Sequence, residues 1–265
     1  MNKFFLSALL AIGTTAAIAA EVIEIKEHKD WAKGSDIKLM PNGVWMFPNS
    51  RIINNAKAFK VDPAKKYTIS FDVRKSSDTH DVVIYAGFTC LDADMVRIDP
   101  QFVRCERNSD TKLTADAAQG SNKIRIMLPK NWRKGAKSWS ASLKDRKSCG
   151  GLDLEVINNV SQSEQAADGS VEITLAKPLT KDYPAGTAIH FHSPGPGMYA
   201  ACSAKQLSTE WETISVTISG MQAVPGLPKF DKWWIGTKYA KLLFVTARKS
   251  RNSRVEFRNI KLTIE

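Results

Sequence analysis

The chain lacks the runs and motifs of an integral membrane protein, a zinc centre or a serine hydrolase. After residue 20, no segment of its 265 residues is apolar enough to cross a bilayer as a helix, so the mature protein is not expected to span a membrane. No two of its four cysteines have C-x₂-C spacing, and no G-x-S-x-G sequence positions a nucleophilic serine. Apolar residues nowhere hold a 3.6-residue period for three turns, which argues against a helical fold.

The N-terminus indicates export. Lys3 precedes a short apolar run that ends in Ala-Ile-Ala-Ala, followed by polar residues, and this order is typical of a secretory signal peptide. We expect a signal over 1–20, cleaved near Ala20–Glu21, and a secreted or periplasmic mature protein. No cysteine follows the cleavage point, so a lipid anchor is not predicted.

The cysteine count favours disulfides in an oxidising compartment. Cys90, Cys105, Cys149 and Cys202 allow three connectivities. Short loops close most easily, which favours Cys90–Cys105 and Cys149–Cys202 over the other two. The sequence therefore predicts two intramolecular bridges, with the pairing left open.

The chain is strongly basic, with 38 Lys and Arg against 27 Asp and Glu and a formal net charge of +11. A basic protein can meet nucleic acid, an anionic membrane or an acidic polysaccharide. Export makes nucleic acid the least suitable of these partners, and an anionic membrane and an acidic polysaccharide both remain. The alternative is that scattered Lys and Arg only keep the surface solvated.

Strand periodicity dominates the mature chain. Apolar and polar residues alternate over 67–73, 124–128 and 214–218, so each segment has one apolar and one polar face. At the C-terminus the apolar phase changes at Arg258–Asn259 within 255–264, which predicts a β-bulge.

Many short strands separated by turn signals predict an all-β fold, a jelly-roll β-sandwich. The middle of the chain differs, with two tryptophans, two cysteines and a Pro/Gly-rich HSPGPG stretch. We expect 21–128 and 205–265 to form the sandwich, and 129–204 to be a small inserted β module. The alternative is that 129–204 is a long decorated pair of loops of the same domain.

Three stretches resemble carbohydrate-binding modules of the families 4 and 9 type. They are YTISFDVRKSSDTHDVVIYAGFTCLDADM, LSTEWETISVTISG and the closing SRVEFRNIKLTIE. DGSVEITLAKPLTKDYPAGTAI and WWIGTKYAKLLFV are also similar to carbohydrate-binding domains of phage tail fibres. The resemblance implies a galactose-binding-like jelly roll and a secreted, non-catalytic protein that binds a polysaccharide or other glycan.

Relatives often hold a structural calcium ion with acidic residues just before the last strand. Here that position reads Arg258-Asn259, which removes the carboxylates that calcium prefers. Asp92 and Asp94 are an alternative, but an Asp-x-Asp pattern is more often a simple turn. We therefore predict no metal and no cofactor.

Sugar recognition needs flat apolar rings together with hydrogen-bonding groups. Trp233 and Trp234 are adjacent, so if their segment is extended at most one of them faces the core. With Tyr239 they form the first predicted sugar platform. Trp132 and Trp139, set among Lys and Arg, form the second. Trp211 opens an apolar strand and is assigned to the core.

The alternative function is a jelly-roll polysaccharide lyase or a glycoside hydrolase. Residues 254–258 match an R-x-E-x-R pattern of alginate lyases, but the order of that motif and the histidine is reversed. The catalytic candidates of this alternative are His190, Tyr199 and nearby basic residues, and no catalytic residue is predicted. A third interpretation is an adhesion protein whose β faces pack on other proteins.

Overall fold

The structure is a computed structural model. It describes residues 20–32, 36–47, 52–77, 82–129, 139–145, 152–157, 159–194, 197–199, 206–223, 231–246 and 254–265. The predicted signal peptide, apart from Ala20, lies outside the described residues.

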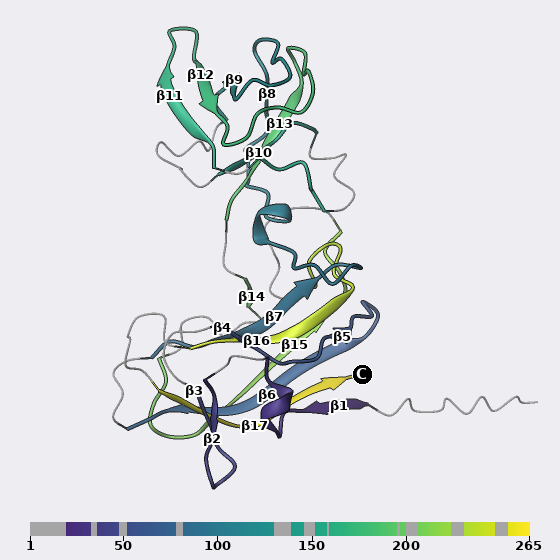
Figure 1. The fold of residues 1–265 in the computed structure, drawn as a ribbon, viewed down its shortest axis with the longest axis vertical. Helices are drawn as coiled ribbons and strands as arrows, with labels where there is room; N and C mark the ends of the chain where they lie inside the picture. The colour runs from purple at the N-terminus through teal and green to yellow at the C-terminus, as the bar shows by residue number, and fades with distance from the viewer. Residues whose placement is uncertain are drawn as a thin grey trace, which may run out of the picture.

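Two antiparallel sheets form a β-sandwich in the lower part of Figure 1. One sheet has the order β15-β6-β17-β3-β2, with β1 paired to β17, and the other has the order β14-β7-β16-β4, with β5 paired to β16. The strands are β1 (Glu21–Glu24), β2 (Lys38–Leu39), β3 (Trp45–Phe47), β4 (Ile52–Asn54), β5 (Phe59–Lys60), β6 (Lys66–Lys75), β7 (Tyr85–Leu91), β14 (Met198–Tyr199), β15 (Glu212–Ser219), β16 (Tyr239–Val245) and β17 (Val255–Ile264), with a 3₁₀ turn η1 (His28–Asp30).

The strand pairing is that of a jelly roll. Taken in chain order, the eight strands β3, β4, β6, β7, β14, β15, β16 and β17 pair first with eighth, second with seventh, third with sixth and fourth with fifth. This nesting of pairs distributes successive strands between two facing sheets. The predicted all-β jelly-roll sandwich is confirmed.

Aromatic rings from both sheets fill the space between them. Phe47 and Phe257 stack at 4.3 Å within one sheet, and Phe244 of the other sheet meets Phe257 edge-on at 5.4 Å. All three side chains are fully buried. They are held there because alternate residues of each strand face the same side.

A second group of strands stands apart from the sandwich, at the top of Figure 1. Two three-stranded sheets, β10-β13-β8 and β11-β12-β9, enclose their own apolar core. The elements are η2 (Pro100–Phe102), which precedes the group, and β8 (Thr111–Lys112), β9 (Lys123–Met127), β10 (Ser140–Ser142), β11 (Ser161–Gln165), β12 (Ser170–Thr174) and β13 (Ala188–His192). We call Cys105–His192 the inserted module, because its two ends meet in a β-bridge.

The module's bounds differ from the predicted 129–204. It is inserted between the fourth and fifth jelly-roll strands, so it takes in β9, which pairs with β12, and it ends before β14, which pairs with β7. Ile124 and Ile126 alternate with polar residues as they would in either sheet. The pattern therefore shows that a strand is present but not which core it joins.

The predicted bulge near the C-terminus is confirmed. The register between β17 and β6 shifts between Arg258 and Lys261, and Asn259 has a φ of 52°. Asparagine tolerates this left-handed conformation better than most residues. The bulge places Arg258 and Asn259 beside Asp72, whose carboxylate accepts hydrogen bonds from both at 3.1 and 2.8 Å.

Gly236 lies where the inserted module meets the sandwich. It has a φ of +79°, and a Cβ at this position would lie 2.7 Å from Cγ of Leu152, which packs on the sandwich core. We expect Gly236→Ala to lower the free energy of unfolding by about 1–3 kcal/mol, because strain and overpacking add. Chemical denaturation measures this loss.

Gly186→Ala is the matched control, since Gly186 also has a positive φ, of +87°, but a Cβ at this position would have no neighbouring atom within 4 Å. It should show the backbone strain alone. Equal losses for the two variants would mean that the contact with Leu152 contributes nothing.

Candidate functional site

Both tryptophans of the first predicted platform are buried. Trp233 is 0% exposed and Trp234 is 3% exposed, so neither ring face is open to solvent. The prediction that at least one is exposed is wrong. Trp233 forms a β-bridge with Met221, and a turn begins at the next residue, with Thr237 N–H donating to the Trp234 carbonyl at 3.2 Å. The extended segment thus ends at Trp233, so the alternation rule does not separate the two side chains.

The other predicted aromatic residues lie in different environments. Trp139 is buried in the core of the inserted module, where its ring lies 5.7 Å from that of Phe191, so it offers no platform either. Trp132 lies outside the described residues. Tyr239 is half-buried at one end of β16.

Trp211, assigned to the core, instead lies half-exposed, with the guanidinium groups of Arg74 and Arg258 over its ring at 4.5 and 4.2 Å. The assignment of Trp211 to the core is therefore wrong.

The outer face of the five-stranded sheet carries a different aromatic pair. Ala86, Phe88 and Cys90 of β7 point into the core, so Tyr85 and Thr89, which alternate with them, point outward. The rings of Tyr85 and Tyr199 lie 5.0 Å apart on this face and are both half-buried. Sequence reasoning missed this pair because neither tyrosine stands in an aromatic-rich segment.

Polar and apolar groups surround the pair. Val245 lies opposite Tyr85 in the register, and Leu243 lies opposite Gly87, which has no side chain to fill the face. Asn54 donates to Thr89 Oγ1 at 2.8 Å. A hollow of about 90 Å³ opens beside Tyr199, and its lining includes Ile52, Asn54, Thr89, Arg97, Tyr199 and Leu243. We call this surface the tyrosine face.

The cysteines do not pair as favoured. Cys90 and Cys105 are not joined by a disulfide. Cys90 Sγ lies 3.2 Å from Met198 Sδ in the sandwich core, and burial raises the pKa of this thiol to about 12. Cys105 belongs to the inserted module. Cys149 and Cys202 lie outside the described residues, so their predicted bridge stays a prediction.

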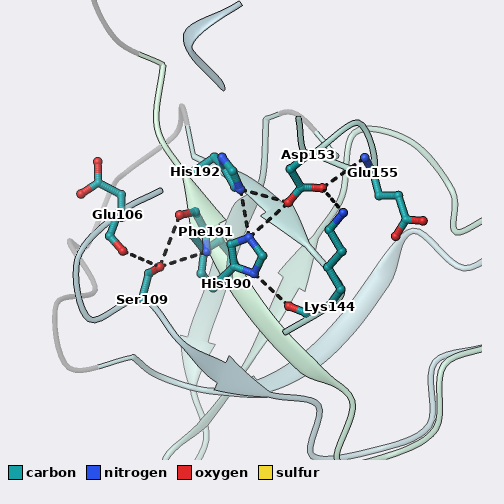
Figure 2. Close-up of polar contacts among 8 residues, drawn as sticks. All are labelled: Glu106, Ser109, Lys144, Asp153, Glu155, His190, Phe191 and His192. Carbon is teal, nitrogen blue, oxygen red and sulfur yellow. Dashed lines mark hydrogen bonds and ion pairs between the residues drawn. The ribbon is translucent and has the colours of Figure 1, made fainter. Parts of the chain in front are cut away.

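A buried polar cluster lies at the base of the inserted module, and Figure 2 shows its contacts. His190 and His192 are on the same side of β13, and their Nε2 atoms are 3.0 Å apart. Each Nε2 lies 3.1 Å from Oδ2 of Asp153. All three side chains are 0% exposed. Lys144 Nζ forms an ion pair with the other carboxylate oxygen of Asp153 at 2.8 Å.

The charges in this cluster are strongly coupled. Burial opposes the Asp153 carboxylate, but hydrogen bonds from His190, His192 and Lys144 hold its pKa well below the ordinary value. Burial also disfavours a charged His190, yet contacts with Asp153 and Cys105 raise its pKa to about 9. Burial lowers the pKa of His192, so one histidine of the pair is neutral.

Part of this cluster, together with Cys105, is the group among the described residues that could hold a metal ion. Cys105, His190 and His192 each offer one ligand atom, and these atoms lie within 4.8 Å of one another. Sequence reasoning did not find this group because Cys105 is 85 residues before His190. The sequence shows that His190 and His192 are two residues apart, but it gives no sign that Cys105 lies beside them.

Comparison with known proteins assigns no family to the chain. No protein-family profile matches the sequence, and no curated protein matches it. The geometry of the described residues therefore carries the functional inference.

The catalytic candidates of the enzyme alternative are not placed in one cleft. His190 is completely buried in the inserted module, whereas Tyr199 lies on the tyrosine face. A general base must come within hydrogen-bonding reach of its substrate.

Among the described residues, no helix is long and apolar enough to cross a membrane.

Proposed function

We propose that the chain is a non-catalytic carbohydrate-binding protein that holds a glycan on the tyrosine face. The observation that carries the proposal is the Tyr85–Tyr199 pair on an otherwise regular strand face. Aromatic rings offer a flat apolar surface to the C–H side of a sugar at little cost in conformational entropy.

The neighbouring groups suit the rest of a sugar ring. Asn54 and Thr89 supply amide and hydroxyl groups for sugar hydroxyls, and Leu243 and Ile52 extend the apolar floor. Ile52 is 62% exposed, so its side chain is open to a ligand at the rim of the hollow. The hollow is small, about 90 Å³, so it has room for part of one sugar ring rather than for a whole chain.

Charge supports an anionic glycan within this proposal. Arg97 lines the hollow, and Lys241 lies opposite Thr89 in the register. Together with the net charge of +11, these groups favour carboxylated or sulfated sugars. Binding would then weaken with added salt, because exposed charges are screened within about 8–10 Å at physiological ionic strength.

Alanine substitution of the two tyrosines tests the proposal. We expect Tyr199→Ala and Tyr85→Ala each to weaken binding to a hit from a glycan array by about tenfold or more, as for central aromatic residues of other interfaces. Isothermal titration with the mature protein measures the change, and thermal unfolding checks that the fold is kept.

Trp211→Ala is the matched control, because Trp211 is a half-exposed aromatic on the opposite sheet. It should leave glycan affinity unchanged. Normal binding by both tyrosine variants, or the absence of any glycan hit for the wild-type chain, contradicts the proposal.

A further inference from the structure

We propose that Cys105, Asp153, His190 and His192 form a closed tetrahedral site for one zinc(II) ion at the base of the inserted module. The inference is independent of glycan binding. It rests on three donor atoms that lie within 4.8 Å of one another, the Cys105 sulfur and one nitrogen each of His190 and His192. The fourth donor is Oδ2 of Asp153, which lies 3.1 Å from both Nε2 atoms. Thiolate sulfur, imidazole nitrogen and carboxylate oxygen are all ligand types that zinc accepts. The four donors come from three segments that are far apart in the chain and meet only in the folded protein.

The distances fit a small ion. Nε2 of His190, Nε2 of His192 and Oδ2 of Asp153 make a triangle with edges of 3.0, 3.1 and 3.1 Å. Ligand atoms about 2.0–2.1 Å from a tetrahedral ion lie about 3.3–3.4 Å from one another, so the triangle needs only a small expansion. Calcium, with bonds of about 2.3–2.6 Å and a preference for six or more oxygen ligands, does not fit.

Hydrogen bonds alone also satisfy these three groups. If both Nε2 atoms donate to Oδ2 of Asp153, which has a lone pair for each, the two nitrogens lie 3.0 Å apart with no hydrogen bond between them. In the zinc site both histidines instead give up the Nε2 proton, and all three atoms offer lone pairs to the ion. Metal analysis of the protein therefore distinguishes the two states.

The surrounding groups orient two of the donors, those of His190 and Asp153. His190 Nδ1 lies 2.8 Å from the Lys144 carbonyl oxygen, which can only accept, so Nδ1 carries the proton and Nε2 is left to bind an ion. The second oxygen of Asp153 pairs with Lys144 Nζ and accepts from the Glu155 backbone N–H at 3.3 Å. These contacts hold Oδ2 toward the histidines.

Burial indicates a structural role for the ion. Cys105 is 1% exposed and the other three donors are 0% exposed, so protein atoms fill all four positions and leave no open one for substrate. The ion would join the start of the module at Cys105, its end at His192 and the segment that contains Asp153. The thiol of Cys105 is then a ligand rather than half of a disulfide.

Metal content of the full mature chain tests the site directly. We expect one zinc per chain by mass-spectrometric elemental analysis after purification without chelators. Replacement of zinc by cobalt(II) should give the visible bands of a tetrahedral ion together with a thiolate-to-cobalt charge-transfer band. Removal of zinc by a chelator should lower the melting temperature, and added zinc should restore it.

Two variants and two controls locate the ion. Cys105→Ser should abolish the charge-transfer band, and Cys105→Ser and His192→Ala should each weaken cobalt binding more than about 100-fold, since loss of a supporting partner alone typically costs about 10–100-fold. Cys90→Ala and His28→Ala change the same residue types in the sandwich and should keep the full signal.

The wild-type chain keeps the test decisive even if a ligand variant does not fold. A folded wild-type protein that holds less than a tenth of an equivalent of zinc or cobalt after titration overturns the proposal. A cobalt spectrum that Cys105→Ser leaves unchanged overturns it as well.

Discussion

Trp233→Ala lowers the free energy of unfolding by about 3–5 kcal/mol, the range for a tryptophan or phenylalanine removed from a packed core. Trp233 is 0% exposed, and its ring lies 4.6 Å from that of Phe88 and 5.1 Å from that of Tyr67. The variant would leave a cavity between the two sheets that neighbouring rings cannot fill. Urea denaturation followed by far-UV circular dichroism measures the change.

Trp211→Ala provides the comparison for this result. Trp211 is half-exposed, and its contacts with Arg74 and Arg258 are worth about 0.5–1 kcal/mol each at a surface. A loss for Trp233→Ala no larger than that for Trp211→Ala would show that the indole of Trp233 is not packed as described.

Ile173→Ala unfolds the inserted module at a denaturant concentration at which the sandwich persists. Ile173 is fully buried in the module's core, and truncation of such a residue costs about 2–5 kcal/mol. The module and the sandwich have separate apolar cores, so most of this loss should stay within the module. Hydrogen exchange should increase across 105–192 and remain slow across β6.

Ile69→Ala is the matched variant in the sandwich, where Ile69 is 1% exposed. It should increase exchange in β6 and its neighbours to a greater extent than in the module. If both variants increase exchange equally throughout the chain, the two cores unfold as one cooperative unit and the expectation is wrong.

The sequence predicts the class of this fold well, because period-two alternation is a local property. Tyr67, Ile69, Phe71 and Val73 are all buried, and the phase change at Arg258–Asn259 is a bulge. The partner of each strand is not local. The strand at 123–127 joins β12 rather than the sandwich, and nothing in its own residues distinguishes the two outcomes.

The binding residues are harder to predict, because exposure depends on segments that are distant in sequence. Trp233 and Trp234 look suited to a surface loop, yet a bridge at Trp233 and a turn that begins at Trp234 accompany the burial of both rings. Tyr85 and Tyr199 are 114 residues apart and become neighbours only through the pairing of β7 with β14. The proximity of Cys105 to His190 and His192 likewise depends on a bridge between the two ends of the module.

That bridge has a consequence for how such a protein can diversify. The module begins at Cys105 and ends at His192, and these two residues lie side by side in an antiparallel bridge, with Glu106 N–H donating to the Phe191 carbonyl at 2.8 Å. Neighbouring ends make a segment exchangeable, since its removal or replacement leaves no gap to span. A related gene could therefore gain, lose or swap this piece in a single recombination event and keep the jelly roll that carries it.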